Sequence, residues 1–383
     1  MAINSISPKW VEEVRSQGIG TIPTADNGSI NSDLTAWNKL QTLINQSINS
    51  GSPFSNQIVG TYNLGYTETN SWDYFGVIMS LDGDIHLVPF SSRIGRKFNN
   101  GVMSTYGLIY TKSDAYVGGV LAPNGDIHFV PHSAMVGQKI SSAGLVSTYS
   151  LVHAMNGAYH GGILAPNGDI HFIPFYANVG QKVSASGVVS TYNLLHRYGG
   201  SGDAVYSEGV LAPNGDIHFI PWISSIGQKI DSNGVVSTYS FIYTTSGGYS
   251  GGVLAPNGDI HLVPYSATVG QKININGVVS TYSLIHTQSN AYSHGVLASN
   301  GDIHFIPAPN TSVGQKINSS GIVSTYSLLK TGLSTCGGIL DLNGDVCIFT
   351  DGRNSGSATL LKMSTISSKF DKNICLSPFF NKF

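Results

Sequence analysis

The amino-acid sequence predicts an all-β fold, a seven-bladed β-propeller built from four-stranded antiparallel blades. Three observations predict this fold. One unit of about 43 residues recurs seven times between residues 58 and 363, and such a period is typical of propellers and related arrays. Each unit contains four short runs rich in Val, Ile, Phe, Tyr and Thr. The chain also has one extra strand-like run before the first unit and lacks one run in the last unit.

The second unit shows how four strands follow from the sequence. Its apolar runs are Gly119–Pro123, Ile127–Pro131, Gly137–Ile140 and Val146–Leu151. The first two runs are joined by Asn124-Gly125, a two-residue corner that closes a tight antiparallel hairpin because both residue types tolerate a positive φ. This corner ends in an aspartate that recurs in every unit: Asp84, Asp126, Asp169, Asp216, Asp259, Asp302 and Asp345.

The two ends of the repeat region predict how the ring closes. The run Ile58–Leu64 reads as a fourth strand without a unit of its own, whereas the last unit ends after its third strand, Ala358–Met363. We expect the first run to complete the last blade, because pairing of the two ends hides sheet edges that an open array would expose. The propeller is therefore predicted to occupy residues 58–365, followed by a C-terminal tail at 366–383.

Residues 1–57 do not repeat and are predicted to form a short helical segment. Ser7-Pro8 is a helix start that Gly18 ends, and a second amphipathic helix is expected from Asp33 to about Asn49. This segment has two interpretations: packing against the propeller, or docking on a partner in an oligomeric assembly.

Composition excludes some functional classes. Only 10% of the residues are charged and the net charge is −2, so the sequence indicates no basic surface for nucleic acid. No apolar stretch is long enough to predict insertion into a membrane. No phosphate-binding glycine loop or other cofactor motif is present, and no cofactor is expected.

Four polar residue types recur at fixed positions and have two interpretations. In the second unit they are Asp126, His128, Lys139 and Tyr149. A metal site is not expected, because equivalent residues on separate blades lie too far apart to bind one ion. Catalysis needs unlike groups at one point, which seven equal copies do not provide. The sequence therefore predicts a structural hydrogen-bonding network and a protein that is not an enzyme.

A candidate ligand-binding face is predicted from loops and aromatic residues. The loops that precede the first strand and follow the second strand share one face and vary most in length, which favours recognition there. Two series of aromatic residues lie on this face, and packing between blades is the slightly favoured interpretation of the first series. The first series contains Tyr116, Tyr159, Tyr206, Tyr249 and Tyr292. The second contains Phe90, Phe175, Trp222 and Tyr265, with His132 in phase.

The repeated sequences Leu-Ala-Pro-Asn-Gly-Asp-Ile-His-Phe, Val-Gly-Gln-Lys-Ile and Val-Val-Ser-Thr-Tyr-Ser-Leu resemble repeats in uncharacterised proteins of tailed bacteriophages. The stretch from Ala25 to Ile44 resembles the segment that caps phage tail-spike β-helices. These resemblances imply a non-enzymatic virion protein, on the head or tail, that is assembled in the bacterial cytoplasm. It would bind other virion proteins through residues 1–57 and host surface glycan through the variable face. The alternatives are a multivalent lectin and, less favoured, a propeller enzyme that processes glycans.

Overall fold

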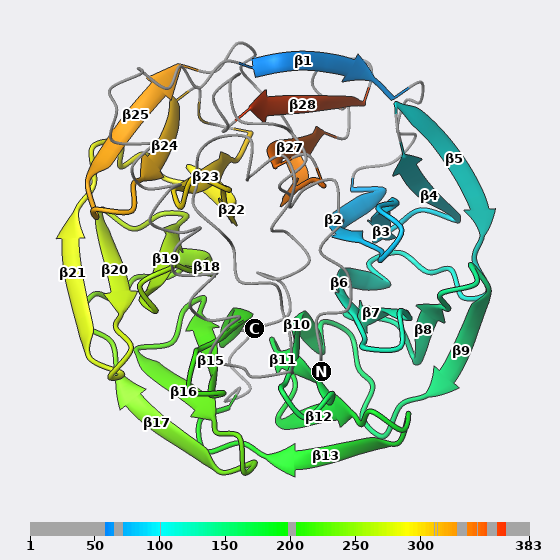
Figure 1. Ribbon diagram of the computed structural model, residues 1–383. Coiled ribbons are helices and arrows are strands. Elements are labelled where there is room, and N and C mark those ends of the chain that lie inside the picture. The colour runs from blue at the N-terminus through cyan, green and yellow to red at the C-terminus, as the bar shows by residue number, and fades with distance from the viewer. Residues whose placement is uncertain are drawn as a thin grey trace, which may run out of the picture. The chain divides into compact units, whose positions relative to one another are not determined.

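The computed structural model describes residues 58–64, 72–99, 101–197, 204–309, 311, 313–327, 335–342, 344–350 and 358–364. These residues form seven four-stranded antiparallel sheets arranged as the blades of a propeller (Figure 1). The predicted fold class is confirmed for this part of the chain. The predicted helices within residues 1–57 and the tail at 366–383 lie outside it, and the domain boundaries stay predictions. None of the described residues belongs to a helix that could span a membrane.

The first two strands of each blade form the hairpin nearest the axis of the ring (Figure 1). The inner strands are β2 (Tyr74–Met79), β6 (Tyr116–Leu121), β10 (Tyr159–Leu164), β14 (Tyr206–Leu211), β18 (Tyr249–Leu254), β22 (Tyr292–Leu297) and β26 (Thr335–Leu340). The second strands are β3 (Ile85–Pro89), β7 (Ile127–Pro131), β11 (Ile170–Pro174), β15 (Ile217–Pro221), β19 (Ile260–Pro264), β23 (Ile303–Pro307) and β27 (Asp345–Thr350).

The other two strands form the outer half of each blade. The third strands are β4 (Ile94–Asn99), β8 (Val136–Ile140), β12 (Val179–Val183), β16 (Ile226–Ile230), β20 (Val269–Ile273), β24 (Val313–Ile317) and β28 (Thr359–Ser364). The outermost strands are β5 (Val102–Gly107), β9 (Val146–Ser150), β13 (Val189–Asn193), β17 (Val236–Ser240), β21 (Val279–Ser283), β25 (Val323–Ser327) and β1 (Ile58–Asn63).

The predicted closure of the ring is confirmed. The N-terminal strand β1 pairs antiparallel with β28, with Tyr62 opposite Leu360 and Thr61 opposite Leu361, and becomes the outermost strand of the last blade (Figure 1). The inner strand begins earlier than the sequence indicates: β6 starts at Tyr116 rather than at Gly119. A register shift between Tyr116 and Gly119 explains the difference, because the irregular backbone hides the strand period.

The hydrophobic core lies between neighbouring blades. Val120 and Val130 of the second blade pack with Tyr159, Ile170 and Phe172 of the third in one buried cluster. The same arrangement recurs around the ring, and all five residues of each second strand from β3 to β23 are buried. Because each sheet is covered on both faces, its second strand is buried throughout, and its one polar residue, a histidine, is buried with the apolar ones.

A buried glutamine connects most neighbouring blades, a role that the sequence did not indicate. Gln138 on β8 is 0% exposed, and its side-chain oxygen accepts hydrogen bonds from the backbone N–H groups of Ile109 and Tyr110 at 3.0 and 2.8 Å. Those two donors follow the outermost strand of the preceding blade. Equivalent bonds are made by Gln181, Gln228, Gln271 and Gln315. Each amide satisfies backbone donors that would otherwise be buried without a partner.

Candidate active site

The four recurrent polar residue types form hydrogen bonds within each blade. The Lys139 ammonium lies 2.6 Å from the Asp126 carboxylate. The His128 Nδ1 atom lies 3.1 Å from the Tyr149 hydroxyl. Burial lowers the pKa of His128 to about 4, so its imidazole is neutral at pH 7. The equivalent groups of the first and the third to sixth blades make equivalent contacts, and these pairs satisfy one another's polar atoms.

The tyrosines of the first aromatic series do not form a binding face. Tyr116, Tyr159 and Tyr206 are 0% exposed, and Tyr249 and Tyr292 are equally enclosed. Their hydroxyl groups donate to backbone carbonyls at the start of the third strand, as Tyr116 does to Val136 at 3.1 Å. The proposal that these rings contact a ligand is therefore corrected: they fill the gaps between blades.

The blades differ from one another where the inner strands lie nearest the axis. The second residues of these strands are Phe75, Val117, His160, Ser207, Ser250, Ser293 and Cys336. The third residues are Gly76, Gly118, Gly161, Glu208, Gly251, His294 and Gly337. Glycine or another small residue is the common choice because seven strands converge here. Glu208, His160 and His294 are therefore exceptions to the repeat.

A break in register precedes all of these exceptions. Each inner strand shifts against its second strand immediately after its first residue, for example between Tyr159 and Gly161 and between Tyr206 and Glu208. Such β-bulges re-aim side chains and often occur next to active sites. Here the shift lies at the end of the strand that is joined to the variable loops.

The exceptional side chains come together across the ring. The Phe75 ring centroid lies 5.5 Å from that of His160 and 5.7 Å from that of His294, although the three residues belong to the first, third and sixth blades. His160 Nδ1 lies 2.8 Å from the carbonyl oxygen of Ser207, the residue before Glu208. We define Phe75, His160, Glu208 and His294 as the axial site.

Glu208 occupies space that two glycines leave open. A Cβ atom on Gly251 of the next blade would overlap a carboxylate oxygen of Glu208, and one on Gly161 of the preceding blade would lie 3.2 Å from its Cα atom. The backbone N–H of Gly252 donates to the same carboxylate at 3.3 Å. Burial raises the pKa of Glu208 to about 7, and the Gly252 bond only partly offsets this. The carboxyl group is thus poised to gain or lose a proton at neutral pH.

Hydrogen bonds fix which nitrogen of each histidine is free. A backbone carbonyl only accepts, so His160 Nδ1 must donate to Ser207 and its Nε2 atom carries the lone pair. His294 Nδ1 contacts the Ser293 hydroxyl at 3.1 Å, which contacts the Thr335 hydroxyl at 3.2 Å. The Thr335 hydroxyl donates to the Pro307 carbonyl. The Ser293 hydroxyl must therefore donate to Thr335, and His294 Nδ1 must donate to Ser293. His294 Nε2 is then an acceptor too.

Both imidazoles are held neutral. Burial lowers the pKa of His160 to about 3 and that of His294 to about 4. The axial site therefore combines one proton donor, the Glu208 carboxyl, with two proton acceptors. Within the described ranges, no group of three or more His, Cys, Asp or Glu side chains is arranged to hold a metal ion.

The second aromatic series borders the axial site on the variable face, and its rings are half-buried. Phe90, His132 and Phe175 form a row with centroid separations of 6.0 and 5.6 Å. Phe175 also stacks on His160 at 4.9 Å. Trp222 and Tyr265 form a separate pair at 5.1 Å. The role of this series in binding a ligand stays a prediction.

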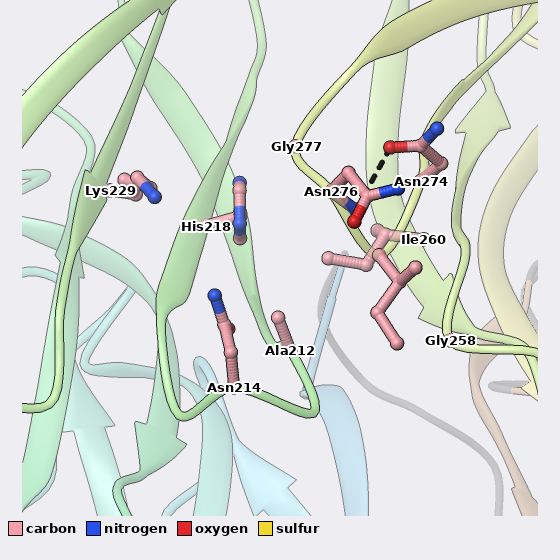
Figure 2. A pocket seen from close by; sticks show the side chains of 10 residues that line it. Ala212, Asn214, His218, Lys229, Gly258, Ile260, Asn274, Asn276 and Gly277 are labelled. Carbon is pink, nitrogen blue, oxygen red and sulfur yellow. Dashed lines mark hydrogen bonds between the residues drawn. The ribbon is translucent and has the colours of Figure 1, made fainter.

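A hollow lies between the fourth and fifth blades, beside the Asn-Gly-Asp corners. It encloses about 240 Å³ and is lined by Asn214, His218 and Lys229 on one wall and by Asn274 and Asn276 on the other (Figure 2). The Lys229 ammonium is paired with the Asp216 carboxylate at 2.5 Å. Its polar groups are therefore those of the recurrent network, and they do not form a distinct site.

Comparisons with known proteins identify the fold. No family model and no curated protein sequence matches this chain. A streptogramin B lyase structure superposes with a TM-score of 0.67 at 18% identity, covering 80% of this chain and 97% of that one. Virginiamycin B lyase from Staphylococcus aureus gives 0.68 at 16% identity and covers 80% and 99%. The extracellular domain of a hybrid two component system from B. thetaiotaomicron gives 0.57 at 12% identity and covers 78% and 42%.

These similarities correct two predictions. The similar structures include lyases and bacterial extracellular domains, so the assignment as a non-enzymatic virion protein is not upheld. The prediction that the protein is not an enzyme is also wrong. It assumed that seven equal blades cannot form a catalytic site, whereas a lyase has the same propeller fold. Repetition of the blades does not exclude catalysis, since unlike residues meet where the blades converge. The predicted partners and location in a virion stay untested predictions.

The sequence contained one signal for the axial site. Glu208 is the only glutamate in the described part of the chain, and it stands where five of the seven inner strands have a glycine and where His294 is the other exception. Alignment of the repeats against one another, with attention to the exceptions rather than to the consensus, would have marked Glu208, His160 and His294.

Proposed function

We propose that this protein is an enzyme that carries out acid–base chemistry at the axial site, with elimination, the reaction type of a lyase, as the favoured reaction. The observation that carries the proposal is the position of Glu208. Its carboxyl group has a pKa near 7 and is the only carboxyl among the four axial-site residues, and His160 Nδ1 donates to the carbonyl oxygen of Ser207, the residue before Glu208. The fold shared with streptogramin B lyase supports elimination as the reaction class.

An elimination from a carbon–oxygen bond assigns a role to each group. The Nε2 atom of His160 or His294 takes a proton from carbon, and the electrons of that C–H bond form a new C=C bond. The C–O bond breaks, its electrons remain on oxygen, and the Glu208 carboxyl donates a proton to that oxygen. The imidazolium and carboxylate formed together have opposite charges, so each stabilises the other and offsets the low basicity of the buried imidazole.

The proposal predicts a pH dependence. Glu208 must be protonated and the histidines neutral, so turnover should be highest between about pH 4 and 7 and should fall as the pH rises through about 7. Two kinds of compound test the proposal: quinupristin, which is present in one structure of virginiamycin B lyase from Staphylococcus aureus, and a panel of esters and ethers that have an acidic C–H on the neighbouring carbon. Mass spectrometry detects the elimination products.

Glu208→Gln keeps the size of the side chain and removes the titrating proton. We expect it to lower turnover by at least about 100-fold, as is usual for loss of a general acid. Asp231→Asn is the matched control, because Asn274 and Asn318 occupy the equivalent position in later blades and make the same turn. No elimination product from any compound, or equal turnover by Glu208→Gln, would refute the proposal.

A further inference from the structure

Trp222 and Tyr265 are placed on the same pair of blades as Glu208. Glu208 on β14 pairs with Ile220 on β15, and Trp222 follows two residues later, where its backbone N–H donates to Val205 at 3.0 Å. Tyr265 occupies the same position in the fifth blade and donates its backbone N–H to Gly248 at 2.9 Å. The aromatic pair therefore joins the fourth and fifth blades at their variable face.

The Glu208 carboxyl spans the same two blades. It extends from the fourth blade toward Gly251 and accepts the N–H of Gly252, both on β18 of the fifth blade. The aromatic pair and the carboxyl thus bridge one blade junction, with the pair at the end of the hairpin and the carboxyl two residues further along the strand.

The two rings differ from the rest of the aromatic series in their surroundings. Phe90, His132 and Phe175 are already in contact with the rings of the axial site. Trp222 and Tyr265 make their only ring contact within the described part of the chain with each other, and both are half-buried. Gly247, at φ +60°, packs under the indole, since a Cβ atom there would lie 3.5 Å from Cζ2. The pair is therefore supported from beneath and accessible from solvent.

The series is interrupted at the sixth and seventh blades, which lie between the fifth and first blades around the ring. The equivalent positions in the sixth and seventh blades are Ala308 and Thr350, which are small and buried. The aromatic series therefore covers the first to fifth blades and leaves a gap of two blades. Aromatic rings bind flat apolar or aromatic groups with little loss of conformational entropy.

We propose that Trp222 and Tyr265 determine substrate specificity by binding an aromatic ring of the substrate, whose reacting carbon then lies at Glu208. This inference rests on the proposed function, because it specifies the substrate class of the same site. The expected substrate is an uncharged molecule that carries an aryl group a few bonds from an eliminable oxygen. An uncharged molecule is favoured because the neutral axial site offers no ion pair to a charged one.

Ligand-observed saturation-transfer NMR on the full chain tests the inference with two matched probes, N-benzylacetamide and N-(cyclohexylmethyl)acetamide. We expect the benzyl probe to bind at least about fivefold more tightly, because stacking and edge-to-face contacts require an aromatic ring. Trp222→Leu and Tyr265→Leu should each remove this preference. Tyr243→Leu is the control, since Tyr243 lies in the connection between the fourth and fifth blades but contacts Tyr249 and Thr268 instead.

The outcomes separate this inference from the proposed function. Glu208→Gln should keep the preference for the benzyl probe, since it does not alter the aromatic pair. If no compound is turned over but the preference depends on Trp222, the aryl-binding site stands and catalysis fails. If the benzyl probe does not bind, or binds equally to folded Trp222→Leu, the inference is overturned even where turnover is found. Thermal unfolding of each variant establishes that it is folded.

Discussion

The outer strands and the inner strands of the blades differ in how closely they repeat. In the second to sixth blades, the outer strands keep the same Gly-Gln-Lys and Ser-Thr-Tyr sequences, and they pair in the same register. The inner strands keep their apolar residues but change at the two positions nearest the axis. In this protein the repeated residues build the scaffold, and the residues that break the repeat form the candidate site.

The same comparison applies to glycine. Gly137 on β8 lies opposite Tyr149 and is covered by its ring, an aromatic–glycine pair that recurs along the third and outermost strands. Gly251 on β18 is covered by the end of the Glu208 side chain. One substitution, glycine to alanine, therefore tests the two regions with the same chemical change.

Gly251→Ala should have the largest effect on activity. The new Cβ atom would overlap the Glu208 carboxylate, and because this is the end of a flexible side chain, the carboxyl moves while the backbone stays. We expect turnover to fall about 100-fold, since a shift of about 1 Å in a catalytic group has that cost. Steady-state kinetics and thermal unfolding would check it. Normal turnover with a normal melting temperature would contradict the placement of Glu208.

Gly137→Ala should have the opposite profile. Its Cβ atom would overlap the ring of Tyr149, which is held by neighbouring residues and by His128. We expect the free energy of unfolding to fall by about 1–3 kcal/mol, as for other overpacked positions. Turnover per folded molecule should be unchanged, because this blade position is remote from the axial site. Denaturant unfolding measures the first quantity, and an unchanged midpoint would show that the aromatic–glycine pairs are not tightly packed.

Acid should destabilise the folded protein through its buried histidines. Burial lowers the pKa of His86, His128, His171, His218 and His261 to about 4, whereas unfolded histidine titrates near 6.5. The unfolded chain then binds more protons between these values, so stability falls as the pH drops from about 6.5 through 4.

The raised pKa of Glu208 acts in the other direction. The folded protein keeps this proton up to about pH 7, so Glu208 adds stability as the pH falls, but it is one group against these five histidines together with His160, His294 and His304. Denaturant melts at pH 7, 6, 5 and 4 measure the balance. His128→Asn should reduce the slope by one proton, and a flat profile would show that these histidines are hydrated.

Much of the fold was predictable because it is repeated. Strand identity, blade count and pairing of Ile58–Asn63 with Thr359–Ser364 follow from aligning one unit on the next. The Lys139–Asp126 pair follows from alternation along the strands. Gln138 was not recognised, since its partners, the backbone groups of Ile109 and Tyr110, have no signature in the sequence.

The axial site was not predictable in the same way. In the sequence, 48 residues separate His160 from Glu208, and 86 residues separate Glu208 from His294. Only closure of the ring brings their blades to a common axis. A single Glu208 among glycines also has little weight in a consensus. The tyrosines of the first series recur at one position of the repeat, which suggested a shared binding role. Their burial shows that this recurrence reflects packing between blades.

The protonation of Glu208 is the most direct test of the proposed chemistry. Difference infrared titration of the wild-type protein against Glu208→Gln isolates the C=O stretch of this one carboxylic acid. We expect the band to persist at pH 6 and to disappear with a midpoint at about pH 7. A midpoint near 4.5, the value of a hydrated glutamate, would show that Glu208 is an ordinary solvent-exposed carboxylate and would contradict its role as the proton donor.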